Sequence, residues 1–331
     1  MNPTFRALVV NQINEDFSCH IQQLLMNDLP DSDVLIKVSY SSVNYKDGLA
    51  LSPNGRVVAT YPMVPGIDLA GTVVSSKDNR YKQGDQVLVT GYGLGISHYG
   101  GYAEYAAVPG DWVVPLPAGL TPKEAMIIGT AGFTAALSIH RLEQNGMQQG
   151  KGKVLVTGAS GGVGSLAIAM LSKLGYGAIA STGKESEHEF LKQIGAEEII
   201  SREAIGAGNH KPLDRQTWAY AIDPVGGKTL AAITSKLIYG GSVAVSGLTG
   251  GSEVPTHVYP FILRGVSILG IDSVNCPMEL RTAIWKRLAS DMKPANLHQI
   301  GSKEIRLEQV PEAVTAIFQG KVRGRIVVSH V

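Results

Sequence analysis

Apolar and polar positions change their rhythm along the chain near residue 120. Before that point, short apolar stretches of strand type are separated by segments rich in Gly, Pro, Asn and Asp, which is typical of a compact, mostly antiparallel β domain. The stretches are ALVV (7–10), VLIKVSY (34–40), LAGTVV (69–74), QVLVTG (86–91) and EYAAV (104–108). The segment 112–122, WVVPLPAGLTP, carries three prolines and closes this region.

A helical pattern then runs from Pro122 to about Asn145, and from residue 153 strand and helix patterns alternate. This alternation predicts a parallel sheet with helices on both faces. A last helical pattern at 278–292 is followed by 305–320 and by the strand-like 325–331. We expect this last portion to return to the first domain.

The segment 153–164, KVLVTGASGGVG, joins an apolar strand to a glycine-rich turn and then to an apolar helical run. That order is typical of the phosphate cradle of a dinucleotide-binding βαβ unit. Glycines permit positive φ and a close approach of the backbone, and Gly164 lets the helix pack tightly on the strand. We expect the turn residues to hold a pyrophosphate at the helix N-terminus. These residues are Ser160, Gly161, Gly162 and Val163.

The end of the second strand of such a unit, about 20 residues past the glycines, selects the nicotinamide cofactor. Here Thr182, Gly183 and Lys184 occupy that place, without the acid that would accept a 2′-hydroxyl of NAD. Hydroxyls followed by a cation suit a 2′-phosphate, so NADP(H) is the expected cofactor. Glu185 and Glu187 follow and argue against a phosphate at this place. However, acids are usual in the first turn of a helix, where they interact with the helix dipole. Arg202 follows the third strand and is a further candidate for the phosphate or the adenine.

The composition excludes several classes of function. The formal net charge is +1, and no dense stripe of Lys and Arg occurs, so we expect no nucleic acid partner. No uninterrupted run of ~18 apolar residues and no signal-peptide pattern occur, so we expect no membrane partner and a cytoplasmic protein. Cys19 and Cys276 are too few for a disulfide framework and are expected to be inert thiols.

With these features in hand, the sequence resembles the zinc-free medium-chain dehydrogenases/reductases, in particular the branch of quinone oxidoreductases and acrylyl-CoA reductases. The matching segments span most of the chain in family order. They are SSVNYKDGLA (41–50), PGIDLAGTV (65–73), GDWVVPLP (110–117), IGTAGFTA (128–135), TGASGGVG (157–164), IDPVGG (222–227) and FILRGVSILGIDS (261–273). The resemblance implies an α/β fold: a doubly wound parallel sheet of Rossmann type (125–295) plus a split, mostly β GroES-like catalytic domain (1–124 and 296–331). It also implies an active cleft between the domains and a homodimer.

The chain departs from the zinc-dependent relatives where they bind metal. Those enzymes carry a cysteine in place of Asn44 and Gly-His-Glu in place of residues 66–68, Gly-Ile-Asp here. A catalytic zinc needs about three N, S or O side-chain ligands. We therefore expect no metal. Among the eight scattered histidines, only His98 is a candidate for the cleft.

The resemblance also implies residue roles. Tyr45 would lie against the nicotinamide, where its hydroxyl orients the ring or gives a proton to the substrate. Asn44 would bind a carbonyl oxygen, whereas Asp47 is expected to fix the loop by capping or by pairing with Lys46. Strand ends in parallel sheets collect ligands, and three further positions match the nicotinamide side of the family's cofactor site. They are Leu248, Ile262 and Ser273.

Three functions stay open at this point. Without a metal, no Lewis acid polarises a substrate carbonyl, so the expected hydride acceptor is one that is already electron-poor. The first hypothesis is an NADPH-dependent reductase of activated alkenes such as acryloyl-CoA or an enone, and the second is an NADPH:quinone oxidoreductase. The third is a non-catalytic NADPH-binding sensor or structural protein.

Overall fold

The structure is a computed structural model that describes residues 3–14, 16–301 and 303–331. The chain forms two compact units. Unit 1 comprises Met1–Thr130, Val274–Trp285 and Gly301–Val331, and unit 2 comprises Ala131–Ser273 and Lys286–Ile300. The domain limits expected from the sequence, 1–124 with 296–331 and 125–295, stay a prediction.

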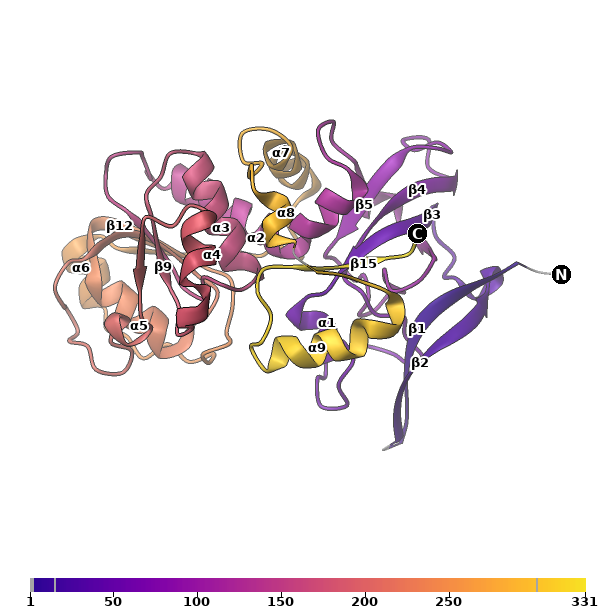
Figure 1. The fold of residues 1–331 in the computed structure, drawn as a ribbon, viewed down its shortest axis with the longest axis horizontal. Coiled ribbons are helices and arrows are strands. Elements are labelled where there is room, and N and C mark those ends of the chain that lie inside the picture. The colour runs from indigo at the N-terminus through magenta and orange to yellow at the C-terminus, as the bar shows by residue number, and fades with distance from the viewer. Residues whose placement is uncertain (1–2, 15, 302) are drawn as a thin grey trace. The chain divides into compact units, whose positions relative to one another are not determined.

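Unit 1 is built on strands, as the apolar stretches predict. A seven-stranded sheet has the order β14-β15-β3-β4-β5-β7, with β6 paired to β3, and β1 and β2 form a separate hairpin. The strands are β1 (Thr4–Ile13), β2 (Asp16–Leu25), β3 (Val34–Ser42), β4 (Asp68–Ser76), β5 (Gln86–Thr90), β6 (Tyr105–Val108), β7 (Val114–Pro115), β14 (Lys303–Ile305) and β15 (Ile326–Ser329). Because β15 pairs antiparallel with β3, the end of the chain joins the sheet of its beginning (Figure 1).

Among the described residues of unit 1, the helices α1 (Tyr45–Ala50) and α9 (Val310–Phe318) lie wholly within the unit and pack on each other. The division between the units falls within α2 (Pro122–Gln144) and α7 (Met278–Leu288). Among the helices of the described ranges, only α2 is long and apolar enough to cross a membrane, but 83% of its most apolar window is buried inside the protein. We therefore interpret α2 as a core helix.

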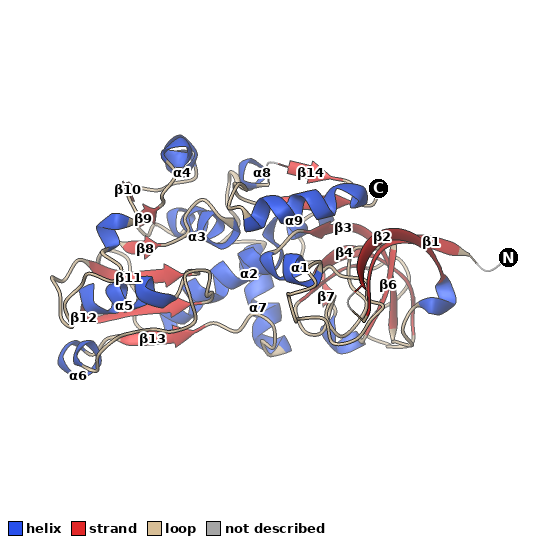
Figure 2. Ribbon diagram, turned by 90° about the horizontal axis from the view of Figure 1, so that it is seen from below, coloured by secondary structure: helices blue, strands red, loops and turns tan. Residues whose placement is uncertain are grey.

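Unit 2 contains the parallel sheet that the alternating pattern predicts, in the order β10-β9-β8-β11-β12-β13. Its strands are β8 (Val154–Val156), β9 (Ala178–Ser181), β10 (Glu198–Ile200), β11 (Trp218–Asp223), β12 (Leu237–Val245) and β13 (Ser267–Gly270). Its helices are α3 (Gly162–Lys173), α4 (His188–Gln193), α5 (Gly227–Lys236), α6 (Tyr259–Arg264) and α8 (Leu297–Ile300). The strands β11, β12 and β13 point the same way in Figure 2.

This strand order is that of a doubly wound sheet and confirms the predicted fold class. The first strand of the series, β8, lies at the centre next to β11, so the winding reverses between them. β8 and β11 are buried throughout, as central strands covered on both faces are. The fold thus brings the glycine turn after β8 to the crevice where such sheets bind ligands.

Candidate cofactor site and active site

The turn after β8 has the geometry of a phosphate cradle. Gly158 has φ +55°, a left-handed conformation that favours glycine. A Cβ on Gly164 would lie 2.4 Å from the carbonyl oxygen of Gly158, so only glycine allows the first turn of α3 to sit this close to the loop. The structure brings Ser160–Val163 to the start of this 12-residue helix, and the N-terminus of a helix attracts an anion.

Asp223, at the end of β11, shapes the crevice beside this turn. Its carboxylate accepts hydrogen bonds from Thr157 Oγ1 and from the backbone N–H groups of Val225 (3.1 Å) and Gly226 (3.0 Å). Burial raises the pKa of Asp223, and these three donors oppose the rise. Because the loop itself uses these acceptors, we assign Asp223 a structural role.

The candidates for the 2′-phosphate lie at the ends of two adjacent strands. β9 and β10 pair in register up to their last residues. A Cβ on Gly183 would lie 3.1 Å from Arg202 Nε, so the Arg202 side chain lies against the Gly183 backbone. The backbone N–H of Lys184 donates to Thr182 Oγ1 at 3.2 Å. The structure thus brings Thr182, Gly183, Lys184 and Arg202 together, and two cations with a hydroxyl fit a phosphate ester.

Further predicted contacts follow β12 and β13 at the same edge of the sheet. Leu248 is 67% exposed and Ser273 is half-buried. Ser246 comes directly after β12, and within the described part of the chain its buried Oγ has no hydrogen-bond partner. A buried polar atom without a partner costs about 1–3 kcal/mol. Its position at a strand end therefore favours a hydrogen bond to a ligand.

Ile262 does not lie at this edge. Arg264, in the last turn of α6, donates to the carbonyl oxygens of Ser235 (2.8 Å) and Leu237 (3.3 Å), where β12 begins. Therefore α6 lies at the N-terminal edge of the sheet, opposite the glycine turn, and Ile262 is 70% exposed there. The expected contact of Ile262 with the cofactor does not fit this position. The matching segment 261–273 crosses from one edge of the sheet to the other, which sequence alone does not reveal.

In unit 1, Asn44 belongs to a buried polar cluster. Its Nδ2 donates to Asp68 Oδ2 at 2.8 Å and to Ser42 Oγ at 3.4 Å. Its Oδ1 accepts from Arg325 Nη1 at 3.0 Å, and Arg325 Nη2 lies 3.8 Å from Asp68 Oδ2. These contacts engage both N–H groups and the oxygen of the amide. The expected role of Asn44 in binding a substrate carbonyl does not fit them, and we interpret Asn44 as a positioning residue.

Arg325 links the cluster to α2. Its Nε donates to the carbonyl oxygen of Ile127 at 3.1 Å, and α2 breaks two residues later at Gly129, with φ 49° and ψ −160°. A Cβ on Gly129 would lie 2.6 Å from Asp68 Oδ2. Because the helix breaks here, the backbone N–H of Thr130 donates a hydrogen bond to the same Asp68 oxygen, with an N–O distance of 2.9 Å. Arg325 and the role of Asp68 are not predictable from the sequence, because no local pattern marks partners so far apart in the chain.

Asp47 anchors the start of α1, as expected from the sequence. Its carboxylate accepts the backbone N–H groups of Asn44 (2.8 Å) and Ile67 (2.9 Å). Burial, and then the nearby charge of Asp68, raise the pKa of Asp47 to about 7. Tyr45, the first residue of α1, is 48% exposed and thus remains accessible beside this buried cluster.

The donors at the positions of the family's zinc ligands do not fit zinc. Asn44 offers an amide instead of a thiolate, and the Asp68 carboxylate is engaged by Ser42, Asn44 and Thr130. No group of three or more His, Cys, Asp and Glu suited to a metal occurs among the described residues. His98 Nε2 donates to the carbonyl oxygen of Ala107 at 2.7 Å, which gives it a structural role. That the protein binds no metal stays a prediction, which elemental analysis tests.

Comparisons with known proteins agree on one family. The alcohol dehydrogenase GroES-like domain matches residues 30–118, and the zinc-binding dehydrogenase domain matches residues 162–290. YhfP of Bacillus subtilis, provisionally named a quinone oxidoreductase, is 57% identical over 99% of both chains, and its crystal structure with NAD bound superposes with a TM-score of 0.97. The acrylyl-CoA reductase AcuI of Ruegeria pomeroyi is 46% identical over 98% of both chains. The yhdH oxidoreductase of Salmonella enterica in complex with NADP is 47% identical over 98% of this chain and 100% of that chain, with a TM-score of 0.95.

Proposed function

Because the chain belongs to the medium-chain dehydrogenase/reductase family and is an oxidoreductase, we propose that it transfers hydride from NADPH to an electron-poor alkene. The leading substrate is a 2-enoyl thioester such as acryloyl-CoA. The observation that carries the proposal is the replacement of a zinc donor set by the closed Asn44–Asp68–Arg325 cluster. A site that lacks a Lewis acid suits an acceptor that is already polarised. An alkene conjugated to a thioester is such an acceptor.

The reaction adds a hydride to the β-carbon and a proton to the α-carbon of the alkene, which leaves a saturated thioester. The nicotinamide supplies the hydride when bound. We propose that Tyr45 holds the nicotinamide and the acceptor in register and that its hydroxyl is a candidate donor of the proton. The half-exposed ring at the start of α1, anchored by Asp47 and Asn44, supports this role.

We propose that the diphosphate binds at Ser160–Val163 and the 2′-phosphate at Thr182, Gly183, Lys184 and Arg202. The candidates at the nicotinamide end are Leu248, Ser273 and the Ser246 hydroxyl, whose buried oxygen has no hydrogen-bond partner among the residues that the structure describes. One related structure holds NAD and another holds NADP, so the choice between them depends on the residues of this chain. Two cations at adjacent strand ends favour NADP(H).

The enoyl reductase proposal is tested with purified protein, NADPH and acryloyl-CoA, by following the absorbance of the reduced cofactor. We expect its consumption to depend on both the protein and the thioester. Turnover no faster than the protein-free blank would remove acryloyl-CoA as a substrate.

Lys184→Glu should weaken NADPH binding by about 1–3 kcal/mol, because a charge-assisted contact to the 2′-phosphate is lost. NADH, which lacks this phosphate, should bind almost as before. Fluorescence titration with each cofactor measures both affinities. Lys192→Glu, in the last turn of α4, makes the same charge change and is the matched control. Unchanged NADPH affinity in Lys184→Glu would show that the phosphate binds elsewhere.

A quinone is the second candidate acceptor, because it is electron-poor without help from a metal. The provisional name of YhfP supports it. Faster NADPH oxidation with quinones than with enoyl thioesters distinguishes the two.

We propose that the protein is a homodimer and that the second copy pairs at β13. This strand ends the six-stranded sheet and exposes Ile268, and nearby α6 exposes further apolar side chains. These are Tyr259, Ile262 and Leu263. An apolar edge strand that stays uncovered invites pairing with another chain.

Ile268→Lys should therefore shift the protein from dimer to monomer, because it introduces charge into the proposed interface. Light scattering coupled to size exclusion measures the mass. Ile13→Lys, at an equally apolar exposed position on β1, is the control and should leave the mass unchanged. A dimer that persists in Ile268→Lys contradicts the placement of the interface.

A further inference from the structure

Two aromatic rings from distant parts of the chain form an exposed corner in unit 1. Tyr45 begins α1, and Phe318 ends α9. Their ring centroids lie 5.0 Å apart, and the ring planes meet at 78°. Tyr45 is 48% exposed and Phe318 is 42% exposed. Each ring thus contacts the other with part of its surface and leaves the rest exposed to solvent.

The chain makes room for this corner at Gly48. A Cβ there would lie 2.6 Å from Phe318 Cζ and 2.9 Å from Val314 Cγ1. Val314 is a buried residue of α9 and belongs to a hydrophobic core cluster. Glycine at position 48 therefore allows α9 to approach α1 closely, and the Phe318 ring is held against the helix that carries Tyr45.

Phe318 contacts Tyr45, but it is not among the residues assigned above to the binding of the cofactor phosphates or to the cluster around Asn44. We propose that Phe318 is a specificity-determining residue that, together with Tyr45, binds the flat ring of a quinone-type acceptor. The proposal rests on the assignment of Tyr45 to the active site in the proposed function. Aromatic rings attract one another in offset or edge-to-face arrangements, and a quinone offers an electron-poor ring to two electron-rich ones. The reacting part of an enoyl thioester has no ring and gains no such contact.

The activity to which this corner would contribute is the one given above as the second candidate, the two-electron reduction of a quinone to a hydroquinone. One quinone takes up a hydride, which oxidises one NADPH to NADP⁺, and a proton from solvent completes the hydroquinone. The contact with the two rings would strengthen the binding of the quinone and leave the geometry of hydride transfer unchanged. Its effect should therefore appear in the ratio of the two acceptor activities.

The test measures kcat/KM of the full-length protein with NADPH and either 1,4-naphthoquinone or acryloyl-CoA. Phe318→Leu keeps an apolar side chain without a ring, and we expect kcat/KM for the quinone to fall by about threefold to tenfold. The value for acryloyl-CoA should stay within about twofold, the lower end of the same range. Phe318→Tyr keeps the ring and should retain the activity with the quinone.

Phe17→Leu is the matched control, because Phe17 makes a comparable edge-on pair with Tyr61, at 6.4 Å and 89°, and neither residue belongs to α1 or α9. It should change neither activity. Equal losses with both acceptors in Phe318→Leu, or no loss with either, overturn the specificity role. If the unmodified protein reduces acryloyl-CoA but no quinone, this inference fails while the proposed function stands. If it reduces neither, both fail.

Discussion

Arg325→Met should lower the free energy of unfolding by about 3–5 kcal/mol, the cost of removing one partner of a buried ion pair. Arg325 is 3% exposed. Its guanidinium donates hydrogen bonds to the carbonyl oxygens of Ile127 and Val43 and to the Asn44 amide oxygen. It also forms an ion pair with the Asp68 carboxylate. Methionine fills much of the volume but donates no hydrogen bond. Asp68 would then stay buried without its cationic partner. Urea denaturation followed by circular dichroism measures the loss.

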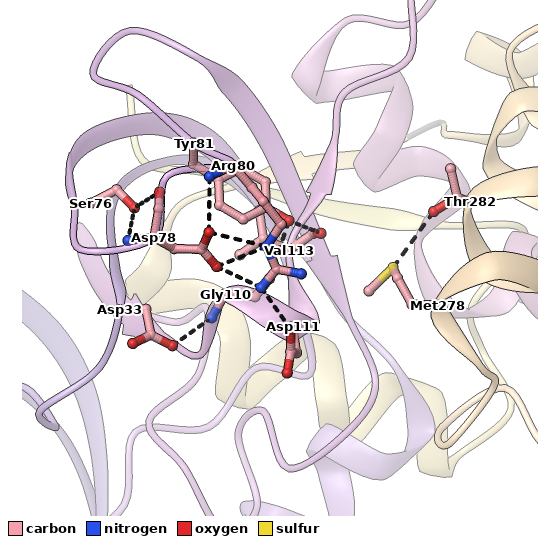
Figure 3. Close-up of polar contacts among 10 residues, drawn as sticks. All are labelled: Asp33, Ser76, Asp78, Arg80, Tyr81, Gly110, Asp111, Val113, Met278 and Thr282. Carbon is pink, nitrogen blue, oxygen red and sulfur yellow. Dashed lines mark hydrogen bonds and ion pairs between the residues drawn. The ribbon is translucent and has the colours of Figure 1, made fainter.

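Arg80→Met is the control for this prediction. Arg80 also pairs with two carboxylates, Asp78 and Asp111 (Figure 3). Its side chain, however, is 53% exposed. Exposed ion pairs contribute little to stability because water and salt screen them. We expect a much smaller change for Arg80→Met. The double variant Arg325→Met/Asp68→Asn should recover part of the loss, because no buried charge is left unpaired. Equal effects of the two arginine substitutions would contradict the assignment.

Gly164→Val should weaken the binding of NADPH and NADH alike, by about 3 kcal/mol or roughly 100-fold. A Cβ at this position would lie 2.4 Å from Gly158 O and 2.7 Å from Ala159 Cα, and backbone atoms cannot turn aside as a side-chain end can. The loop must therefore shift away from the start of α3, where the diphosphate common to both cofactors is proposed to bind. Titration with each cofactor measures the two affinities.

The matched control is Gly161→Ala in the same turn. There a Cβ would meet only Gly158 O, at 3.2 Å, and φ is −82°. Because the loop can keep its place against α3, we expect a smaller loss of affinity from this substitution than from Gly164→Val. The pattern differs from that of Lys184→Glu, which should affect NADPH alone. A Gly164→Val protein that stays folded and binds NADPH normally would rule out the cradle.

Much of unit 2 was predictable because its signals are local. The strand, glycine turn and helix at 153–173 follow one another in the sequence, and Lys184 lies where a second strand ends. The expected cofactor contact of Ile262 does not fit its place in the structure, for the opposite reason. Its segment matches a family pattern, but α6 and the end of β13 lie at different edges of the sheet, and a linear match does not distinguish them.

The sequence by itself determined the α/β fold, the turn that suits a diphosphate and the loss of zinc ligands, because steric preferences, hydrophobic periodicity and donor chemistry act within short segments. Only the tertiary structure decided that Asn44 is engaged by Asp68 and by Arg325, 281 residues away, and that Phe318 lies against Tyr45. Those contacts arise because β15 pairs with β3 in the sheet of unit 1 and α9 packs on α1. Long-range packing of this kind leaves no local mark, since each partner alone looks like an ordinary strand or helix residue.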